Sequence, residues 1–111
     1  MLTNDINIAH ELNKKPDIEL IVAGGVRKKP SATLACMFTE QMLSQTHFDL
    51  AFISVDAVDI ETGLMDYNTE EIQLKRTMIK NSTRSIVLCD HAKFKNKAFM
   101  SICSLNMINI I

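Results

Sequence analysis

Three short apolar runs, each followed by polar residues, dominate the hydrophobic pattern of this chain. They cover residues 18–23, 49–55 and 85–89. Each run has the length of a strand and is nearly apolar throughout, which is typical of a strand covered on both faces in a parallel sheet. The starts of successive runs are about thirty residues apart, the size of a strand–helix–strand unit. The pattern therefore predicts an α/β fold.

Capping residues and helical spacing predict three helices around these strands. A short helix begins after Asn4 or Asp5 and carries apolar residues on one face. A second helix covers about residues 34–45, and its predicted apolar face consists of Ala35, Phe38 and Met42. The third begins at Asn68, has Glu71 three residues later as in a capping box, and runs to residue 81.

The remaining segments are predicted as turns and loops, with further strands near the end. Residues 26–31 are basic and read as a loop. A long loop is predicted for residues 56–67, which contain Gly63 and several carboxylates. Beyond residue 98 we expect a short strand, a turn at residues 104–106 and another strand.

Polar residues follow all three predicted strands, where ligands bind in open α/β sheets. Gly24 and Gly25 follow the first strand, Asp56 follows the second, and Lys93 lies three residues after the Asp90 that ends the third. Permissive backbone combined with nearby cations suits an anion such as phosphate. The pattern thus predicts a polar pocket at one edge of a sheet, although each lysine could instead be an ordinary surface residue.

Three carboxylates near the second strand could carry chemistry. Asp56 and Asp59 are three residues apart, and Glu71 lies at the start of the next helix. Such groups can accept hydrogen bonds from sugar hydroxyls or act as an acid/base pair. The alternative is that the aspartates only satisfy loop amides, as aspartate often does.

Composition excludes several classes of protein. The 111 residues carry 12 Lys and Arg against 13 Asp and Glu, a net charge of −1, so the chain is a poor candidate for binding nucleic acid by itself. No apolar run is long enough to span a bilayer, and the polar start shows no signal peptide, which favours a cytoplasmic protein without membrane contact. The Cys and His residues lack metal-site spacing, and we expect neither a metal nor a cofactor. The apolar end at residues 107–111 suggests a fragment of a longer protein.

Several stretches, in matching order and spacing, resemble the effector-binding half of DeoR-type transcriptional repressors. The similar segments are residues 3–12, 16–25, 48–56, 70–79 and 90–94. The resemblance implies a fold similar to ribose 5-phosphate isomerase and glucosamine-6-phosphate deaminase, a three-layer α/β fold with a mostly parallel sheet and helices on both faces. It also implies a sensor without catalytic residues that binds a phosphorylated sugar, forms a homo-oligomer, and modulates operator DNA binding by an N-terminal helix-turn-helix domain. The implied ligand-binding residues are Asn4, Gly24, Gly25, Asp56, Asp59, Glu71, Lys75 and Lys93.

The chain also departs from the family pattern. Residues 1–111 are expected to form a partial sensor domain, without the helix-turn-helix or the first strand and its phosphate loop. Ala57 and Cys36 stand where glycine is common, and Met65-Asp66 replaces a usual Thr-Thr pair. Two other functions therefore stay open: a sugar-phosphate isomerase or deaminase using Asp56, Asp59 or Glu71 as base, and an oligomerisation module with a decayed pocket.

Overall fold

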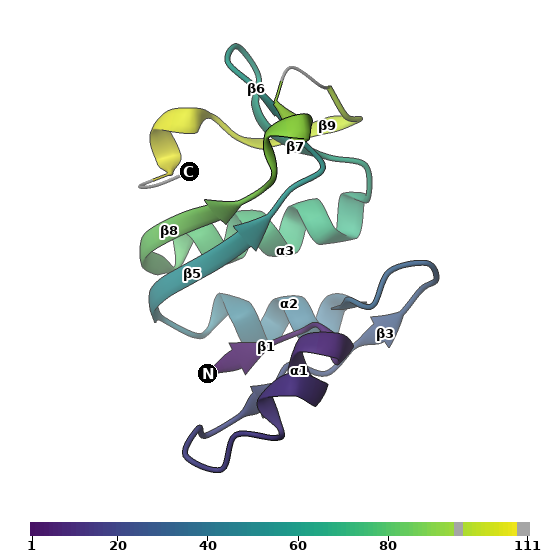
Figure 1. Cartoon of the computed structure of the whole chain (residues 1–111), viewed down its shortest axis with the longest axis vertical. Helices are drawn as coiled ribbons and strands as arrows, with labels where there is room; N and C mark the ends of the chain where they lie inside the picture. Colours follow the sequence, from purple (N-terminus) through teal and green to yellow (C-terminus); the bar gives the residue numbers. More distant parts are fainter. Residues whose placement is uncertain (95–96, 109–111) are drawn as a thin grey trace. The chain divides into compact units, whose positions relative to one another are not determined.

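The computed structural model describes residues 1–94 and 97–108, except for the side chain of His91. The chain divides into two compact units, Met1–Gln45 and Thr46–Ile111. Across the described residues the fold is mixed α/β, with small parallel and antiparallel sheets and three α-helices (Figure 1). None of the described helices is both long and apolar enough to cross a membrane.

The first unit consists of two helices and four two-residue strands. In chain order they are β1 (Leu2–Thr3), α1 (Ile6–Leu12), β2 (Ile21–Val22), β3 (Val26–Arg27), β4 (Leu34–Ala35) and α2 (Met37–Ser44). β1 pairs with β2 in parallel, and β3 pairs with β4 antiparallel. The predicted first helix is confirmed, since Asp5 Oδ1 accepts the N–H groups of Asn7 and Ile8 at 2.8 and 3.0 Å.

Other predictions for the first unit are wrong in extent. The strand expected over residues 18–23 has only the two residues of β2, and the basic loop expected at 26–31 begins with β3. The helix expected from residue 34 begins at Met37, because Leu34 and Ala35 pair with β3 and Cys36 is extended. This shift changes the buried face: α2 buries Thr39 and Leu43, whereas Phe38 is 68% exposed.

The second unit is built around a parallel pair of strands and one helix. β5 (Phe48–Ser54), α3 (Thr69–Lys80) and β8 (Ser82–Leu88) form a strand–helix–strand unit, with α3 behind the two strands in Figure 1. Predictions for all three elements are confirmed to within a few residues. α3 begins where Asn68 Oδ1 accepts the N–H groups of Glu70 and Glu71 at 3.0 and 3.1 Å. The core contains Ile53, Val55, Val58, Leu64, Ile72, Ile79, Val87 and Ile102.

The two faces of the β5–β8 pair differ in burial. Side chains alternate along a strand, so Ile53 and Val87 enter the core with α3. The opposite face carries Leu50, Phe52 and Leu88, which are 41%, 56% and 54% exposed. The nearly continuous apolar runs predicted strands covered on both faces, whereas the described residues of the second unit cover one.

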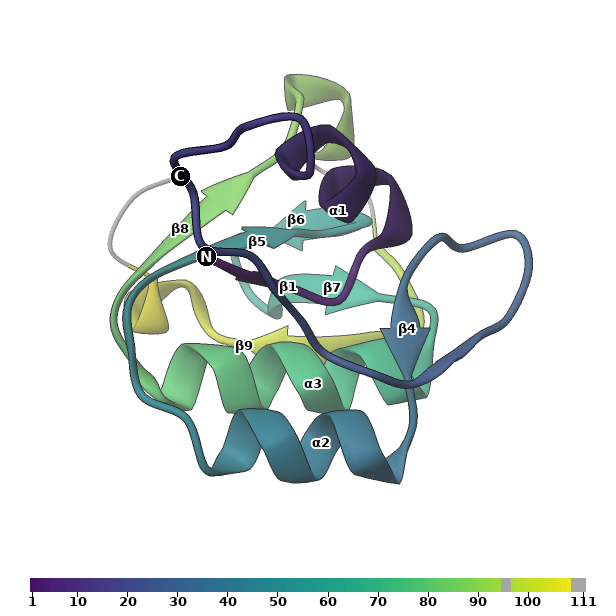
Figure 2. The same ribbon diagram turned by 90° about the horizontal axis from the view of Figure 1, so that it is seen from below.

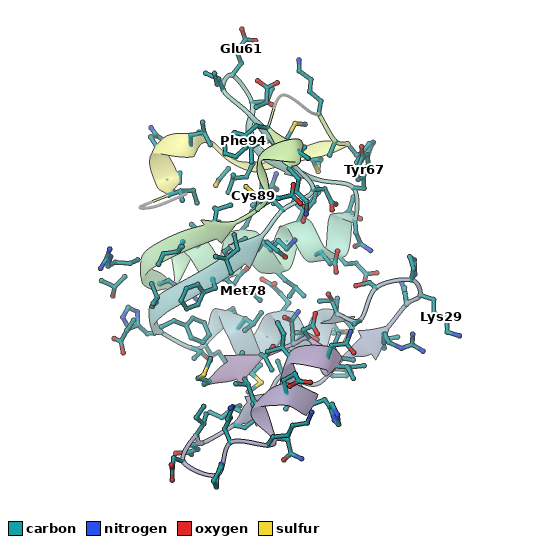
Figure 3. All side chains as sticks on the ribbon, in the orientation of Figure 1. Lys29, Glu61, Tyr67, Met78, Cys89 and Phe94 are labelled. Atoms are coloured by element: carbon teal, nitrogen blue, oxygen red, sulfur yellow. The ribbon has the colours of Figure 1, made fainter. Side chains whose placement is uncertain are left out.

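The long loop predicted for residues 56–67 is wrong, because most of it forms a hairpin. β6 (Ala57–Asp59) pairs antiparallel with β7 (Gly63–Asp66), which also pairs with β9 (Met100–Cys103). Glu61 lies at the tip of this hairpin (Figure 3), and in Figure 2 β9 runs beside α3. Gly63 has a φ of +87°, and a Cβ there would collide with the Cys103 carbonyl, so the turn requires glycine.

Two short 3₁₀ helices complete the described part of the second unit. η1 (His91–Lys93) follows β8, and η2 (Leu105–Met107) follows β9. The short strand expected after residue 98 is confirmed by β9, and η2 overlaps the turn expected at residues 104–106. The last expected strand includes residues 109–111, which lie outside the described residues.

Candidate functional site

In the first unit, Asn4 joins two strands. It follows β1, and its side-chain Nδ2 donates to the Leu34 carbonyl oxygen at 3.0 Å. The Leu34 N–H donates in return to the Asn4 carbonyl oxygen at 2.6 Å. These two hydrogen bonds fix the backbone that leads into α1. The side-chain amide of Asn4 is therefore already engaged, through Nδ2, in holding the fold.

The two glycines after β2 differ in their surroundings. A Cβ on Gly25 would collide with Thr39 Oγ1 and lie 3.0 Å from the Ala35 nitrogen, whereas nothing lies within 4 Å of one built on Gly24. The Thr39 hydroxyl donates to the Gly24 carbonyl oxygen. Close packing against the start of α2 therefore requires glycine at position 25, whereas position 24 has room for a side chain.

The electrostatics of the first turn of α2 favour negative charge. Cys36 is the residue before the first turn, and the backbone N–H of Thr39 holds the pKa of the Cys36 thiol below its ordinary value. Amides at the start of a helix are unpaired within the helix and orient toward an anion. The segment next to Gly24 and Gly25 thus has the character that an anion requires.

In the second unit, Asp56 stands just beyond the carboxyl end of β5. Its N–H donates to Asp66 Oδ1 at 2.8 Å and to the Met65 carbonyl oxygen at 3.2 Å. Its own Oδ2 accepts the N–H of Tyr67 at 3.3 Å, and Figure 3 shows Tyr67 at the edge of the unit. The backbone of Asp56 is therefore fixed while its side chain stays exposed.

Asp66, the last residue of β7, is the most buried charged side chain near this edge. It is 1% exposed, and its Oδ2 lies 2.5 Å from Lys75 Nζ on α3. Burial raises the pKa of the Asp66 carboxyl, and the ammonium of Lys75 and the Asp56 N–H oppose that shift. The structure thus places Lys75, a predicted ligand-binding residue, in an ion pair.

Asp59, at the end of β6, is held as a carboxylate. Its Oδ1 accepts the N–H of Glu61 at 2.9 Å, and its Oδ2 lies 3.5 Å from Lys97 Nζ. The Glu61 N–H, and then the ammonium of Lys97, lower the pKa of the Asp59 carboxyl.

Glu71 and Lys93 are both half-buried. Glu71 lies in the first turn of α3, one turn before Lys75, on the same side of the helix. Lys93 ends η1, where its N–H donates to the Asp90 carbonyl oxygen at 3.2 Å. A bridge between Phe94 and Val58 brings this end of η1 beside β6.

The structure brings some of the predicted residues together. Within the second unit, Asp56 and Lys75 are joined through Asp66, and Lys93 lies beside the strand that carries Asp59. Asn4, Gly24 and Gly25 belong to the first unit. Sequence reasoning missed Asp66. The signal was available, since two short apolar pairs flanking a polar turn that ends in Gly63 indicate a hairpin, and a hairpin would have placed Asp66 beside Asp56.

An open hollow of about 490 Å³ lies elsewhere in the second unit. It is found near the amino end of β8 and is lined by α3, β8, β9 and η2, through residues that include Arg76, Lys80, Thr83 and Ile102. The predicted polar residues instead follow the carboxyl ends of the strands. In the part of the chain that the structure describes, no three His, Cys, Asp or Glu side chains are grouped to hold a metal ion.

Comparison with known proteins gives a consistent result. The family model described as the DeoR C-terminal sensor domain matches residues 1–111. A protein of Escherichia coli O157:H7 named for repression of the aga operon is 34% identical over 99% of this chain. The glycerol-3-phosphate regulon repressor of Escherichia coli K12 is 27% identical over the whole chain. The HTH-type transcriptional regulator GolR of Listeria innocua is 31% identical, also over the whole chain.

The match covers only part of each of these relatives. This chain spans 41% of the first protein and 44% of each of the other two. The similar region is thus less than half of each of these three relatives.

Proposed function

We propose that this chain, which belongs to the DeoR C-terminal sensor domain family, binds a phosphorylated sugar as its effector. One observation carries the proposal. At the carboxyl end of the parallel β5–β8 pair, the exposed carboxylate of Asp56 stands on a hydrogen-bonded backbone, and the half-buried Lys93 lies on the segment that follows β8. Sugar hydroxyls and a phosphate need these two kinds of partner.

We assign the predicted residues of the second unit to this effector site. The carboxylates of Asp56, Asp59 and Glu71 accept hydrogen bonds from hydroxyls, and Lys93 binds the phosphate. Lys75 belongs to the site through its ion pair with Asp66. In the first unit, Asn4, Gly24 and Gly25 are proposed as ligand-binding from their match to the family pattern. Gly24 and Gly25 also adjoin the start of α2, where the backbone amides favour negative charge.

We further propose that effector binding changes operator DNA affinity through an N-terminal helix-turn-helix domain of a longer, homo-oligomeric protein. Support comes from the relatives, which are named as transcriptional repressors and regulators and are more than twice as long as this chain. A DNA-binding partner domain also fits the near-neutral charge of residues 1–111, which suits them poorly to binding DNA alone.

For the complete domain we propose the three-layer arrangement, with a mostly parallel sheet and helices on both faces. The exposed face of Leu50, Phe52 and Leu88 supports this, since large apolar side chains on a sheet are normally covered.

We propose no catalytic turnover. A general base works best with a pKa near the working pH, and the Glu61 N–H and Lys97 move the pKa of Asp59 in the opposite direction. This observation weighs against Asp59 as the base of an isomerase or deaminase.

Thermal melting of the full-length protein tests the function. The probes are glycerol 3-phosphate, ribose 5-phosphate and glucosamine 6-phosphate, each beside its unphosphorylated counterpart. A true effector at a hundredfold excess over its Kd adds about 2.7 kcal/mol of apparent stability, and its counterpart adds far less. Equal shifts from both members of every pair would show that the site does not recognise the phosphate group. No shift with any probe would favour an oligomerisation module. Conversion of a probe to product, lost in Asp59→Asn, would establish an enzyme.

A further inference from the structure

We propose that Asp66 is a positioning residue of the effector site, which holds the Lys75 ammonium and the Asp56 backbone so that Lys75 does not bind the effector's phosphate. The inference deepens the proposed function and rests on the effector site assigned there. Both of the residues that Asp66 holds belong to that site, whereas Asp66 itself is not predicted to touch the ligand.

Both oxygens of the Asp66 carboxylate are engaged. Oδ1 accepts the Asp56 N–H at 2.8 Å, and Oδ2 lies 2.5 Å from Lys75 Nζ. The side chains of Asp66 and Lys75 are 1% and 17% exposed. A carboxylate with so little exposure is costly unless an opposite charge and hydrogen bonds compensate it. The ammonium of Lys75 is therefore committed to balancing Asp66.

The same carboxylate orients Asp56. Asp66 Oδ1 holds the Asp56 N–H, and Asp56 Oδ2 accepts the N–H of Tyr67, so the ends of β5 and β7 are cross-linked in both directions. The exposed carboxylate of Asp56 is thereby fixed before any ligand arrives. A group fixed in advance loses less conformational freedom on binding, which favours affinity and selectivity for hydroxyls.

Negative charge on Asp66 also opposes a phosphate at Lys75. A phosphate that reached Lys75 Nζ would compete with the carboxylate already paired there and would be repelled by it. The neighbouring Lys97 likewise forms an ion pair, with Asp59. Among the described lysines at this edge of the second unit, Lys93 on η1 is therefore left for the phosphate, and Asp66 makes the surface at Asp56 selective for hydroxyls.

The test compares binding of inorganic phosphate to full-length variants, by thermal-shift titration. Asp66→Asn keeps an acceptor for the Asp56 N–H but removes the charge, so Lys75 is released and phosphate should bind about tenfold more tightly. The gain should vanish in the double variant Asp66→Asn with Lys75→Met. Lys80→Met, at an exposed position on the same helix, is the control and should leave phosphate affinity unchanged.

Two results would overturn the inference. One is a gain in Asp66→Asn that persists when Lys75→Met is added, since Lys75 would then not be the group that Asp66 withholds from phosphate. The other is an Asp66→Asn protein that binds phosphate no better than the wild type. Should Asp66→Asn fail to fold, Asp66→Ser, which is also uncharged and keeps a hydroxyl acceptor, replaces it with the same expected and contradicting results. A wild-type protein that binds no phosphorylated probe contradicts the proposed function, yet a Lys75-dependent gain in Asp66→Asn would still support the role of Asp66.

Discussion

The two units of this molecule hold their polar residues in place by different means. The second unit has an apolar core of large side chains that joins β5, β8, α3 and the β6–β7–β9 sheet, including Ile53, Ile72 and Val87. In the first unit, the buried apolar residues are only Ala23, Ala35 and Leu43. Its candidate residues are instead held by backbone hydrogen bonds and by close packing of Gly25. Packing of large side chains thus positions one set of polar groups, and local backbone contacts position the other.

This difference predicts the largest stability effect in the second unit. Ile72→Ala removes a side chain that is 1% exposed in the core beside β5 and β8, and such truncations lower the free energy of unfolding by about 2–5 kcal/mol. Ile60→Ala is the matched control, because Ile60 is 89% exposed and should change stability by less than about 0.5 kcal/mol. Denaturant unfolding measures both. Equal effects would show that this core does not hold the second unit together.

The next effect concerns binding and should leave this framework intact. Lys93→Ala removes the cation assigned to the phosphate and should weaken binding of the sugar phosphate by about ten- to a hundredfold, without a change in melting temperature. Lys15→Ala, at an exposed position after α1, is the control and should bind normally. Calorimetric titration of the full-length protein provides the measurement. Unchanged affinity in Lys93→Ala would exclude Lys93 from the site.

In the first unit, the sharpest contrast is between two adjacent glycines. Gly25→Ala places a methyl group against Thr39 and the Ala35 nitrogen and should cost about 1–3 kcal/mol. Gly24→Ala meets nothing within 4 Å and should cost less than about 0.5 kcal/mol. Thermal melting distinguishes them. If both substitutions were neutral, close packing at Gly25 would not be what holds this unit.

The smallest effect is a difference in pH dependence between two carboxylates of the second unit. The pKa of Asp66 is raised from its ordinary 3.8, so its contribution to stability is largest below that value and is lost as pH rises through the raised pKa. The pKa of Asp59 is lowered from 3.8, so its contribution is present above that value and is lost as pH falls through the lowered pKa.

Unfolding at several values from about pH 3 to about pH 7 tests these opposite signs. The stability of the wild type relative to Asp66→Asn should fall as pH rises, whereas its stability relative to Asp59→Asn should rise. Two slopes of the same sign would contradict the environments assigned to these residues.

The sequence predicted the second unit better than the first for a physical reason. Residues 49–55, 85–89 and the helix after Asn68 have apolar patterns long enough to show their period, and the core buries those patterns. The strands of the first unit have two residues each, too few to show any period. In addition, α2 begins later than predicted because Leu34 and Ala35 pair with β3. No local pattern indicated that pairing.

The candidate site was predicted unevenly for a related reason. Residues at strand ends, such as Asp56 and Lys93, could be found because strand ends are visible in the apolar pattern. Asp66 does not follow one of the long apolar runs, and finding it required recognising a hairpin whose strands are only three and four residues long. Tertiary contacts created its ion pair with Lys75, nine residues further along the chain.

We propose that effector binding to this sensor domain controls operator DNA binding, and titration of a preformed complex tests this proposal. The full-length protein is bound to its operator fragment, and the sugar phosphate that most raises its melting temperature is added. Operator affinity should change by about 5- to 150-fold, the usual range of coupling between two sites, and the change should require a higher concentration in Lys93→Ala. An operator affinity that stays constant at saturating sugar phosphate would show that effector binding does not control DNA binding.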